Sequence, residues 1–147
     1  MAYQFKLEAL RRFREHQEET KQKKLAEAQM DLEADLNRLG EYLAQRERTG
    51  EDLQQCQQQS ATGRQIAVYL NYLQKLNRDI EQQQDIVARK RQVCEAARQE
   101  VLEAMKKRKA LEKLKEKSLQ RYLENLDHEE EKFIGEMAIN RFTHKGR

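Results

Sequence analysis

The sequence contains no proline and no tryptophan, and glycine occurs only five times in 147 residues. Proline is the strongest helix breaker, because it lacks the backbone N–H and its ring clashes with the preceding turn. Without proline, and with few glycines, the chain has few places at which a helix must end. We therefore expect long helices joined by very few turns.

Long apolar runs are missing as well. Hydrophobic residues make up 37% of the chain, charged residues another 37%, and the mean hydropathy is -1.11. No run approaches the roughly 18 apolar residues that indicate a membrane span, and residues 1–8 lack the apolar stretch of a signal peptide. These features argue against a globular core and predict a cytosolic protein.

The residues that dominate instead are Leu, Ala, Glu, Gln, Lys and Arg. Low hydrophobicity with few aromatics is also typical of disorder. These six residue types, however, lose the least on entering a helix. The composition therefore favours solvated helices over a disordered chain.

Residues suited to catalysis or metal binding are few and scattered. Cys56 and Cys94 form no C-x-x-C pair, which predicts two reduced thiols. His128 precedes three glutamates, but Lys132 stands where H-E-x-x-H needs its second histidine. There is no phosphate-binding glycine loop. We expect no catalytic, cofactor-binding or metal site, no cofactor and no small-molecule substrate, and hence no enzyme.

The clearest pattern is a seven-residue repeat in the second half of the chain. Its first position is occupied by Ile66, Leu73, Ile80, Val87, Cys94 and Val101. Three residues later come Tyr69, Leu76, Gln83, Lys90, Ala97 and Ala104. Two such positions per heptad form the seam of a coiled coil, here with a polar centre. Past residue 105 a phase shift is expected, with a new seam through Leu119, Tyr122, Leu126, Phe133 and Met137.

The first half shows helical spacing with less regularity. Its expected seam opens with Phe5, Leu7, Leu10 and Phe13 and continues through Leu25, Ala28, Leu32, Leu36, Leu39 and Leu43. Gly40 and Gly50 each weaken a helix by about 1 kcal/mol relative to alanine. Bending or fraying is therefore expected between residues 40 and 59.

A single turn separates the halves. Residues 60–63 are small, hydroxylic or glycine, and Thr62 followed by Gln65 fits a capping box. The sequence thus predicts an all-α fold, an antiparallel two-helix coiled-coil hairpin with a longer second helix. We expect one coiled-coil domain over residues 1–147, with helices at about 3–59 and 64–142 and the turn at about 60–63.

The hairpin leaves the end of the second helix without a partner. With the turn near Ala61, the start of the first helix lies beside residues 114–119, and later residues overhang by roughly 45 Å. The overhang carries apolar residues that include Leu126, Phe133 and Met137. Because exposed apolar stripes are rare on soluble monomers, this segment is expected to bind a partner.

A basic stretch offers an alternative function. Between Arg89 and Arg121 there are twelve basic and five acidic residues. Such a stretch is able to bind nucleic acid or anionic lipid through phosphate contacts. The interleaved acids at helix-pair spacing favour a solvated helix face or an acidic protein partner instead.

Several features together resemble one known family. They are the opening Phe5-Lys6-Leu7-Glu8-Ala9-Leu10, the glycine turn followed by Tyr69, Tyr72, Leu73, Leu76 and Ile80, and the tail Glu136-Met137-Ala138 with Arg141. In this order they resemble the flagellar export protein FliJ, over nearly the whole chain. The resemblance implies an antiparallel coiled coil similar to the gamma-subunit stalk of F-type ATPases.

The resemblance also implies partners. Family members are cytoplasmic parts of the flagellar type III secretion apparatus, peripheral to the inner membrane at the flagellar base. They insert into the export ATPase hexamer, contact the cytoplasmic domain of the export gate and escort export chaperones. The matching gate positions are Tyr72, Leu76, Asp79 and Gln83, of which Asp79 departs from the small residue usual there. The overhanging Leu126, Phe133 and Met137 are the expected contacts with the ATPase ring.

Two other classes of function stay open on the residues alone. One is a coiled coil that binds nucleic acid through residues 89–121, and the other is a structural linker with no ring-shaped partner. Binding to nucleic acid predicts a steep dependence on salt. The linker predicts neither salt-dependent binding nor a response from an ATPase.

Overall fold

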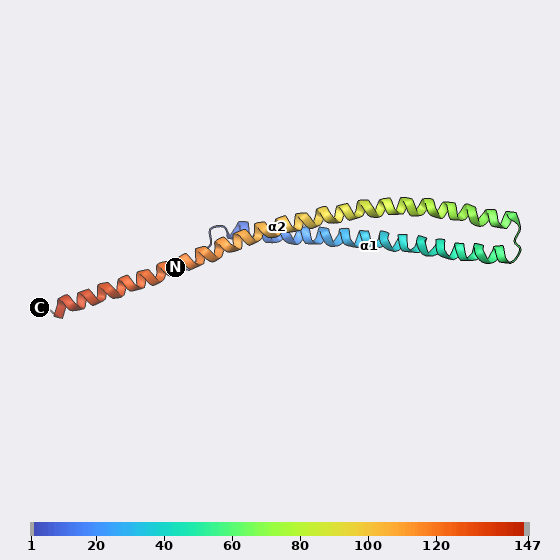
Figure 1. The fold of residues 1–147 in the computed structure, drawn as a ribbon. Helices are drawn as coiled ribbons and strands as arrows, with labels where there is room; N and C mark the ends of the chain where they lie inside the picture. The colour runs from blue at the N-terminus through green and yellow to red at the C-terminus, as the bar shows by residue number, and fades with distance from the viewer. Residues whose placement is uncertain (1, 146–147) are drawn as a thin grey trace. The chain divides into compact units, whose positions relative to one another are not determined.

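The computed structural model describes residues 2–145, which form two long helices and no strand. Helix α1 spans Glu8–Gln58, and α2 spans Gly63–Lys145 and runs back along it (Figure 1). The predicted all-α hairpin with a longer second helix is confirmed. The first helix starts later than residue 3, and it continues through both Gly40 and Gly50. The second extends past residue 142 and ends with the basic residues His144 and Lys145, and the Lys145 ammonium suits the negative end of a helix.

The turn occupies residues 59–62. Ser60 adopts a left-handed conformation with φ of 61°, and the Ala61 amide donates to the Cys56 carbonyl at 3.2 Å, which closes the end of α1. Thr62 then starts α2 with the expected capping box. The Gln65 amide donates to the Thr62 hydroxyl at 3.3 Å, and the Gln65 side chain accepts from the Thr62 amide at 3.2 Å. The chain therefore reverses at the predicted place.

The chain divides into two compact units. One is Thr20–Val101, named here the hairpin unit, and the other is Met1–Glu19 with Leu102–Arg147, named the terminal unit. Helix α2 is continuous through both. In the hairpin unit the two helices lie side by side up to the turn (Figure 1).

The core of the hairpin unit is the predicted heptad seam of α2. Its buried apolar residues are Leu76, Ile80, Val87, Cys94, Ala97 and Val101. The polar centre of the seam is bound by α1. Gln83 is 4% exposed and donates to the backbone oxygen and to the carboxylate of Asp35 at 2.9 and 3.1 Å, and Lys90 pairs with Asp31 and Asp35. Gln83 and Lys90 therefore both have hydrogen-bond or ion-pair partners on α1, and these contacts align the two helices.

The register of the hairpin unit is centred on the turn. Arg46 of α1 donates to the side chain of Asn77 of α2 at 3.3 Å, and further along Lys21 and Lys24 pair with Glu100 at 3.3 and 3.2 Å. These partners lie at nearly equal distances in sequence from Ala61. The contacts thus follow the pairing expected from a turn at that residue.

The predicted phase shift of α2 past residue 105 is wrong. In the terminal unit the side facing α1 continues the same heptad, with Arg108, Lys115 and Tyr122 in one position and Ala104, Leu111 and Ser118 in the other. Leu119, the expected start of a new seam, is 39% exposed. The heptad continues without a shift because the basic residues at its first position, Arg108 and Lys115, form ion pairs with glutamates of α1.

The expected opening of the α1 seam is wrong as well. Leu7, Leu10 and Phe13 are 41%, 38% and 57% exposed, and Phe5 is only partly buried. In the terminal unit the least exposed α1 residues are polar or charged, and among them Glu18 is 7% exposed. The sequence-based prediction followed the apolar residues, whereas ion pairs occupy the interior here.

Candidate functional site

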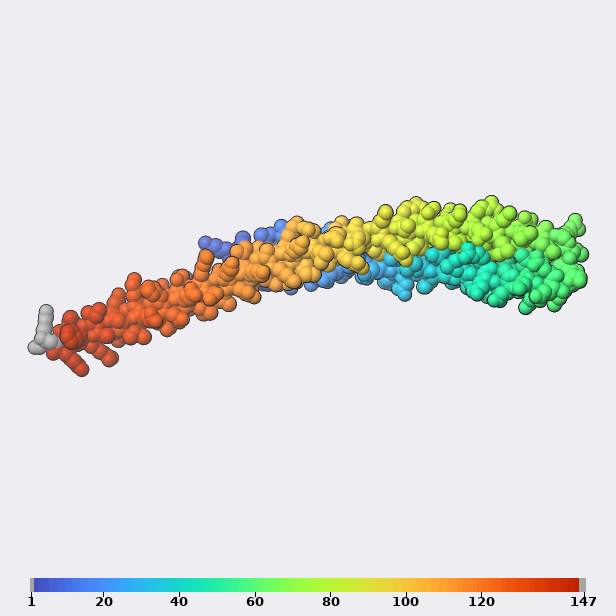
Figure 2. Space-filling model, in the orientation of Figure 1, coloured from blue at the N-terminus to red at the C-terminus, as the bar shows by residue number. Residues whose placement is uncertain are grey.

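An exposed surface with several large apolar side chains lies at the end of α2, named here the tail, residues 123–145. Every residue of the tail is exposed, and Figure 2 shows that no other segment covers its visible face. Its large apolar side chains are Leu123, Leu126, Phe133, Ile134, Met137, Ile139 and Phe142. Three of these, Leu126, Phe133 and Met137, are the predicted ring contacts, with 38%, 62% and 45% of their surface exposed.

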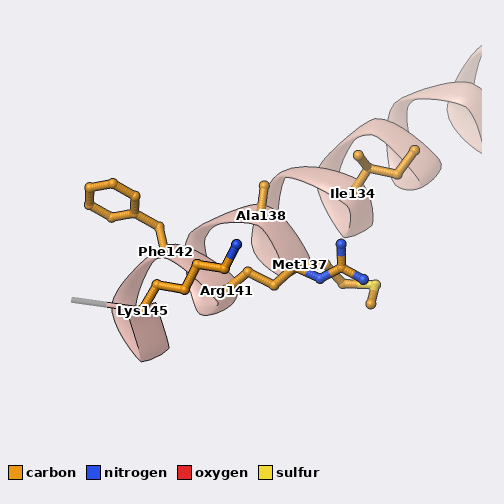
Figure 3. Close-up of a pocket in the computed structure, with 6 residues that line it drawn as sticks. All are labelled: Ile134, Met137, Ala138, Arg141, Phe142 and Lys145. Atoms are coloured by element: carbon orange, nitrogen blue, oxygen red, sulfur yellow. The ribbon is translucent and has the colours of Figure 1, made fainter. Parts of the chain in front are cut away.

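Two shallow depressions follow one another on the tail. The first is lined by Leu126, Glu129, Glu130, Phe133 and Ile134. The second is lined by Ile134, Met137, Ala138, Arg141, Phe142 and Lys145 (Figure 3). They share Ile134, so an apolar strip continues from one to the other. Acidic side chains border its beginning and basic side chains border its end.

Paired charges hold the N-terminal end of α1 against α2, just before the tail. Lys115 Nζ lies 3.2 Å from Glu8 Oε2, and Arg11 Nη2 lies 2.7 Å from Glu8 Oε1. The hydrogen bonds from Arg11, and then from Lys115, lower the pKa of Glu8 from 4.5 to about 2. Glu8 is therefore a carboxylate shared by two cations of different helices.

A second ion pair crosses between the helices further along the terminal unit. Arg108 contacts Glu18 of α1 and lies 2.7 Å from Glu112 on its own helix. The carboxylates of Glu112 and Glu18 raise the pKa of the guanidinium. Arg108 thus occupies a seam position with its charge balanced on both sides.

An aromatic contact marks the last pairing before the tail. The rings of Tyr3 and Tyr122 are 5.4 Å apart at 46°, and the Tyr3 hydroxyl donates to the Lys115 carbonyl at 3.3 Å. Beyond Tyr122 the described residues of α2 are all exposed. The tail as a binding surface therefore begins at Leu123.

The four predicted gate residues do not share one accessible face. Tyr72 is 37% exposed and Asp79 is partly exposed, whereas Leu76 is 3% and Gln83 4% exposed. Leu76 packs in the seam, and Gln83 is hydrogen-bonded to Asp35. Only Tyr72 and Asp79 present surface to a partner while the hairpin is closed.

Exposed apolar residues that the site prediction had not included lie beside both surfaces. Val68, one turn before Tyr72, is 65% exposed, and Phe142, in the last turns of the tail, is 81% exposed. The spacing i, i+4 from Val68 to Tyr72 places the two on one side of α2 and was readable from the sequence. Phe142 belongs to the same exposed end as Met137.

The basic stretch 89–121 is partly used inside the chain. In the hairpin unit Lys90 and Arg98 form ion pairs, and in the terminal unit Arg108 and Lys115 do. Lys106, Lys109, Lys113, Lys117 and Arg121 are exposed, at steps of three or four residues along α2. The stretch is thus divided between pairing the helices and forming a solvated stripe.

Residues 2–145 contain no cluster of histidine, cysteine, aspartate or glutamate suited to a metal ion. No helix within that range is long and apolar enough to cross a bilayer. Cys56 and Cys94 are free thiols, the first partly exposed and the second buried.

Comparison with known proteins gives one match. The family model described as the flagellar FliJ protein matches residues 3–147. No curated protein and no solved structure matches the chain. With a match over essentially the whole sequence, and a helical hairpin as its fold, the chain belongs to the FliJ family, whose members are components of flagellar type III protein export.

Proposed function

We propose that this chain is a coiled-coil rod that binds the export ATPase ring with its tail and the export gate with the start of α2. It also escorts export chaperones. It acts in the cytoplasm, at the membrane-bound base of the flagellum, through binding and without chemistry of its own. The single observation that carries the proposal is the exposed apolar strip of the tail.

The tail suits insertion into a ring because it is a single exposed helix. A helix of 23 residues from Leu123 to Lys145 is about 35 Å long at 1.5 Å per residue. Leu126, Phe133 and Met137 lie along it, so apolar contacts are spread over its length. An isolated helix with such a strip is a common mode of docking into an apolar groove.

The gate contact is proposed at Tyr72 and Asp79, of which the first is exposed on α2 and the second partly exposed. Leu76 and Gln83 are buried in the seam and hold this part of α2 against α1. Aromatic side chains are frequent centres of binding energy in protein interfaces. Val68 extends the apolar patch beside Tyr72. Leu76 and Gln83 contribute to the gate contact indirectly, because their packing fixes the position of the helix that carries Tyr72 and Asp79.

The test separates the two surfaces in the full chain. Phe133→Asp with Met137→Asp should abolish binding to the purified export ATPase and leave gate binding intact. Tyr72→Ala should weaken binding to the gate domain and leave ATPase binding intact. Met30→Asp is the matched control, because Met30 is 71% exposed and lies on neither surface.

A truncated chain ending at Tyr122 provides a second test. It keeps the contact between Tyr3 and Tyr122 and removes the whole tail. Binding of this chain to the ATPase would place the ring contact elsewhere. Loss of gate binding with a normal helical melt would mean that the tail serves both partners.

The alternative function is binding of nucleic acid by the exposed basic residues at positions 106–121 of α2. If the chain binds nucleic acid, its affinity should fall steeply with salt. Exchange of Lys109 and Lys113 for glutamine should then weaken that binding without affecting the ATPase. Equal binding of the variant would exclude this function for the stripe.

A further inference from the structure

Two rows of side chains run along the tail. The first contains Leu126, Glu130, Ile134, Ala138 and Phe142. The second contains Glu129, Phe133, Met137, Arg141 and Lys145. Figure 3 shows the later half of each, with Ile134, Ala138 and Phe142 on one side and Met137, Arg141 and Lys145 on the other. Residues four apart form such ridges on any helix, and the groove between two ridges accepts a ridge from another helix.

The charge of the side chains in the two rows changes along the helix, from acidic near the start of the strip to basic near its end. The second row begins with Glu129 and ends with Lys145, which Arg141 precedes. In the first row Glu130 follows Leu126, and Phe142 is the last residue. Apolar side chains fill the middle. Neither Glu130 nor Arg141 forms an ion pair with another described residue. The strip therefore carries opposite charges at its two ends, and both remain available to a partner.

We propose that the partner of this strip in the free protein is the tail of a second copy of this chain, running in the opposite direction. The two-fold axis passes between Gly135 and Glu136. The spacing of the rows is symmetric about that point, so each row residue meets a row residue of the second copy. Glu130 faces Arg141 of the second copy, and Arg141 faces its Glu130.

The apolar middle fits the same arrangement. Phe133 meets Ala138 of the second copy, so that a large side chain lies over a small one. Ile134 meets Met137, which brings two large apolar side chains together. A parallel pair would instead place Glu130 against Glu130 and Arg141 against Arg141. Charge therefore selects the antiparallel direction.

The contact is short. Rows of residues four apart that interlock on two helices cross at about 50°, so close contact is limited to a few turns around the axis. Such an interface is smaller than those of stable dimers and predicts weak, reversible association. A partner with more contact area would displace the second copy. The pairing needs no ATPase, so it stands or fails independently of the proposed function.

The test is sedimentation equilibrium of the full chain under reducing conditions. Wild type should show a concentration-dependent dimer. Glu130→Arg and Arg141→Glu should each weaken association by about tenfold or more, because each turns two attractions into repulsions. Mixing the two variants should restore the dimer, since each 130 side chain then faces an opposite charge at 141. Glu124→Arg is the control, because it makes the same change of charge outside the rows.

Each outcome decides the proposal. A chain that remains monomeric up to about 1 mM would overturn it. So would a dimer that Glu124→Arg weakens as much as Glu130→Arg, or a mixture of the two single variants that stays monomeric. Circular dichroism of each variant shows that its helices are intact. Restoration in the mixture, and in the double variant Glu130→Arg/Arg141→Glu, would establish the antiparallel contact.

Discussion

The two units of this protein differ in the residues that occupy the seam of α2. In the hairpin unit the seam is apolar around the polar residues Gln83 and Lys90, with Ile80, Val87 and Cys94 buried against α1. In the terminal unit two seam positions of α2 are basic, Arg108 and Lys115, and large apolar side chains lie on the surface. Apolar residues that face inward stabilise a unit by themselves, whereas exposed ones leave apolar surface in contact with water.

This difference in seam composition predicts that the hairpin unit is more stable than the terminal unit. Burial of apolar side chains is the main stabilising contribution in the hairpin unit. Ion pairs that remain partly open to solvent contribute little. We therefore expect the terminal unit to open locally more often than the hairpin unit.

The largest expected effect is at the apolar seam. Ile80→Asp should destabilise the protein by about 3 to 5 kcal/mol, because a carboxylate replaces a side chain that is 3% exposed. Val93→Asp, at a position 54% exposed, should change stability by no more than about 0.5 kcal/mol. Urea denaturation followed by circular dichroism measures both. Equal effects would mean that the buried face of α2 has been misassigned.

An intermediate effect is expected at the charged seam. Arg108→Ala removes the cation beside the buried Glu18 and should cost about 1 to 3 kcal/mol. Replacing both Glu18 and Arg108 by leucine should be nearly neutral or stabilising, as for other buried pairs exchanged for apolar residues. Denaturation of the single and double variants distinguishes these outcomes. A double variant as unstable as the single one would show that the ion pair itself stabilises the terminal unit.

The smallest effect concerns pH. The folded pKa of Glu8 is about 2, below its ordinary value of 4.5. Its carboxylate therefore stabilises the fold fully above about pH 4.5, and this contribution is lost as the pH falls toward 2. The difference in unfolding free energy between wild type and Glu8→Gln should shrink over that range. Urea denaturation at several pH values measures this difference, and a difference that stays constant between about pH 7 and pH 2 would contradict the role assigned to the Glu8 carboxylate.

The sequence predicts the hairpin unit well because its information is local. Six apolar residues from Ile66 to Val101 repeat at the period of a coiled-coil seam, and Thr62 with Gln65 identifies the start of α2. Each of these signals needs only neighbouring residues. The fold class, the turn and the register follow from them.

The terminal unit is predicted poorly because its seam depends on distant partners. Arg108 and Lys115 read as solvent-facing in the sequence, and only Glu18 and Glu8 on the other helix make them interior residues. The expected shift toward Leu119 followed from ignoring this pairing. Similarly, Leu76 and Gln83 match family positions, but their burial follows from the seam. The exposure of the tail was predictable, since it requires only the position of the turn.

We expect the tail to be open in the free, monomeric chain and covered when the export ATPase is bound. Hydrogen exchange measured by mass spectrometry tests it directly, at a concentration where the chain is monomeric. Alone, the amides of residues 123–145 should exchange much faster than those of residues 76–101. Added ATPase should slow exchange in the tail and leave residues 76–101 unchanged. Protection confined to the hairpin unit, or a tail that exchanges equally fast with the ATPase bound, would show that the tail is not the surface that the ATPase covers.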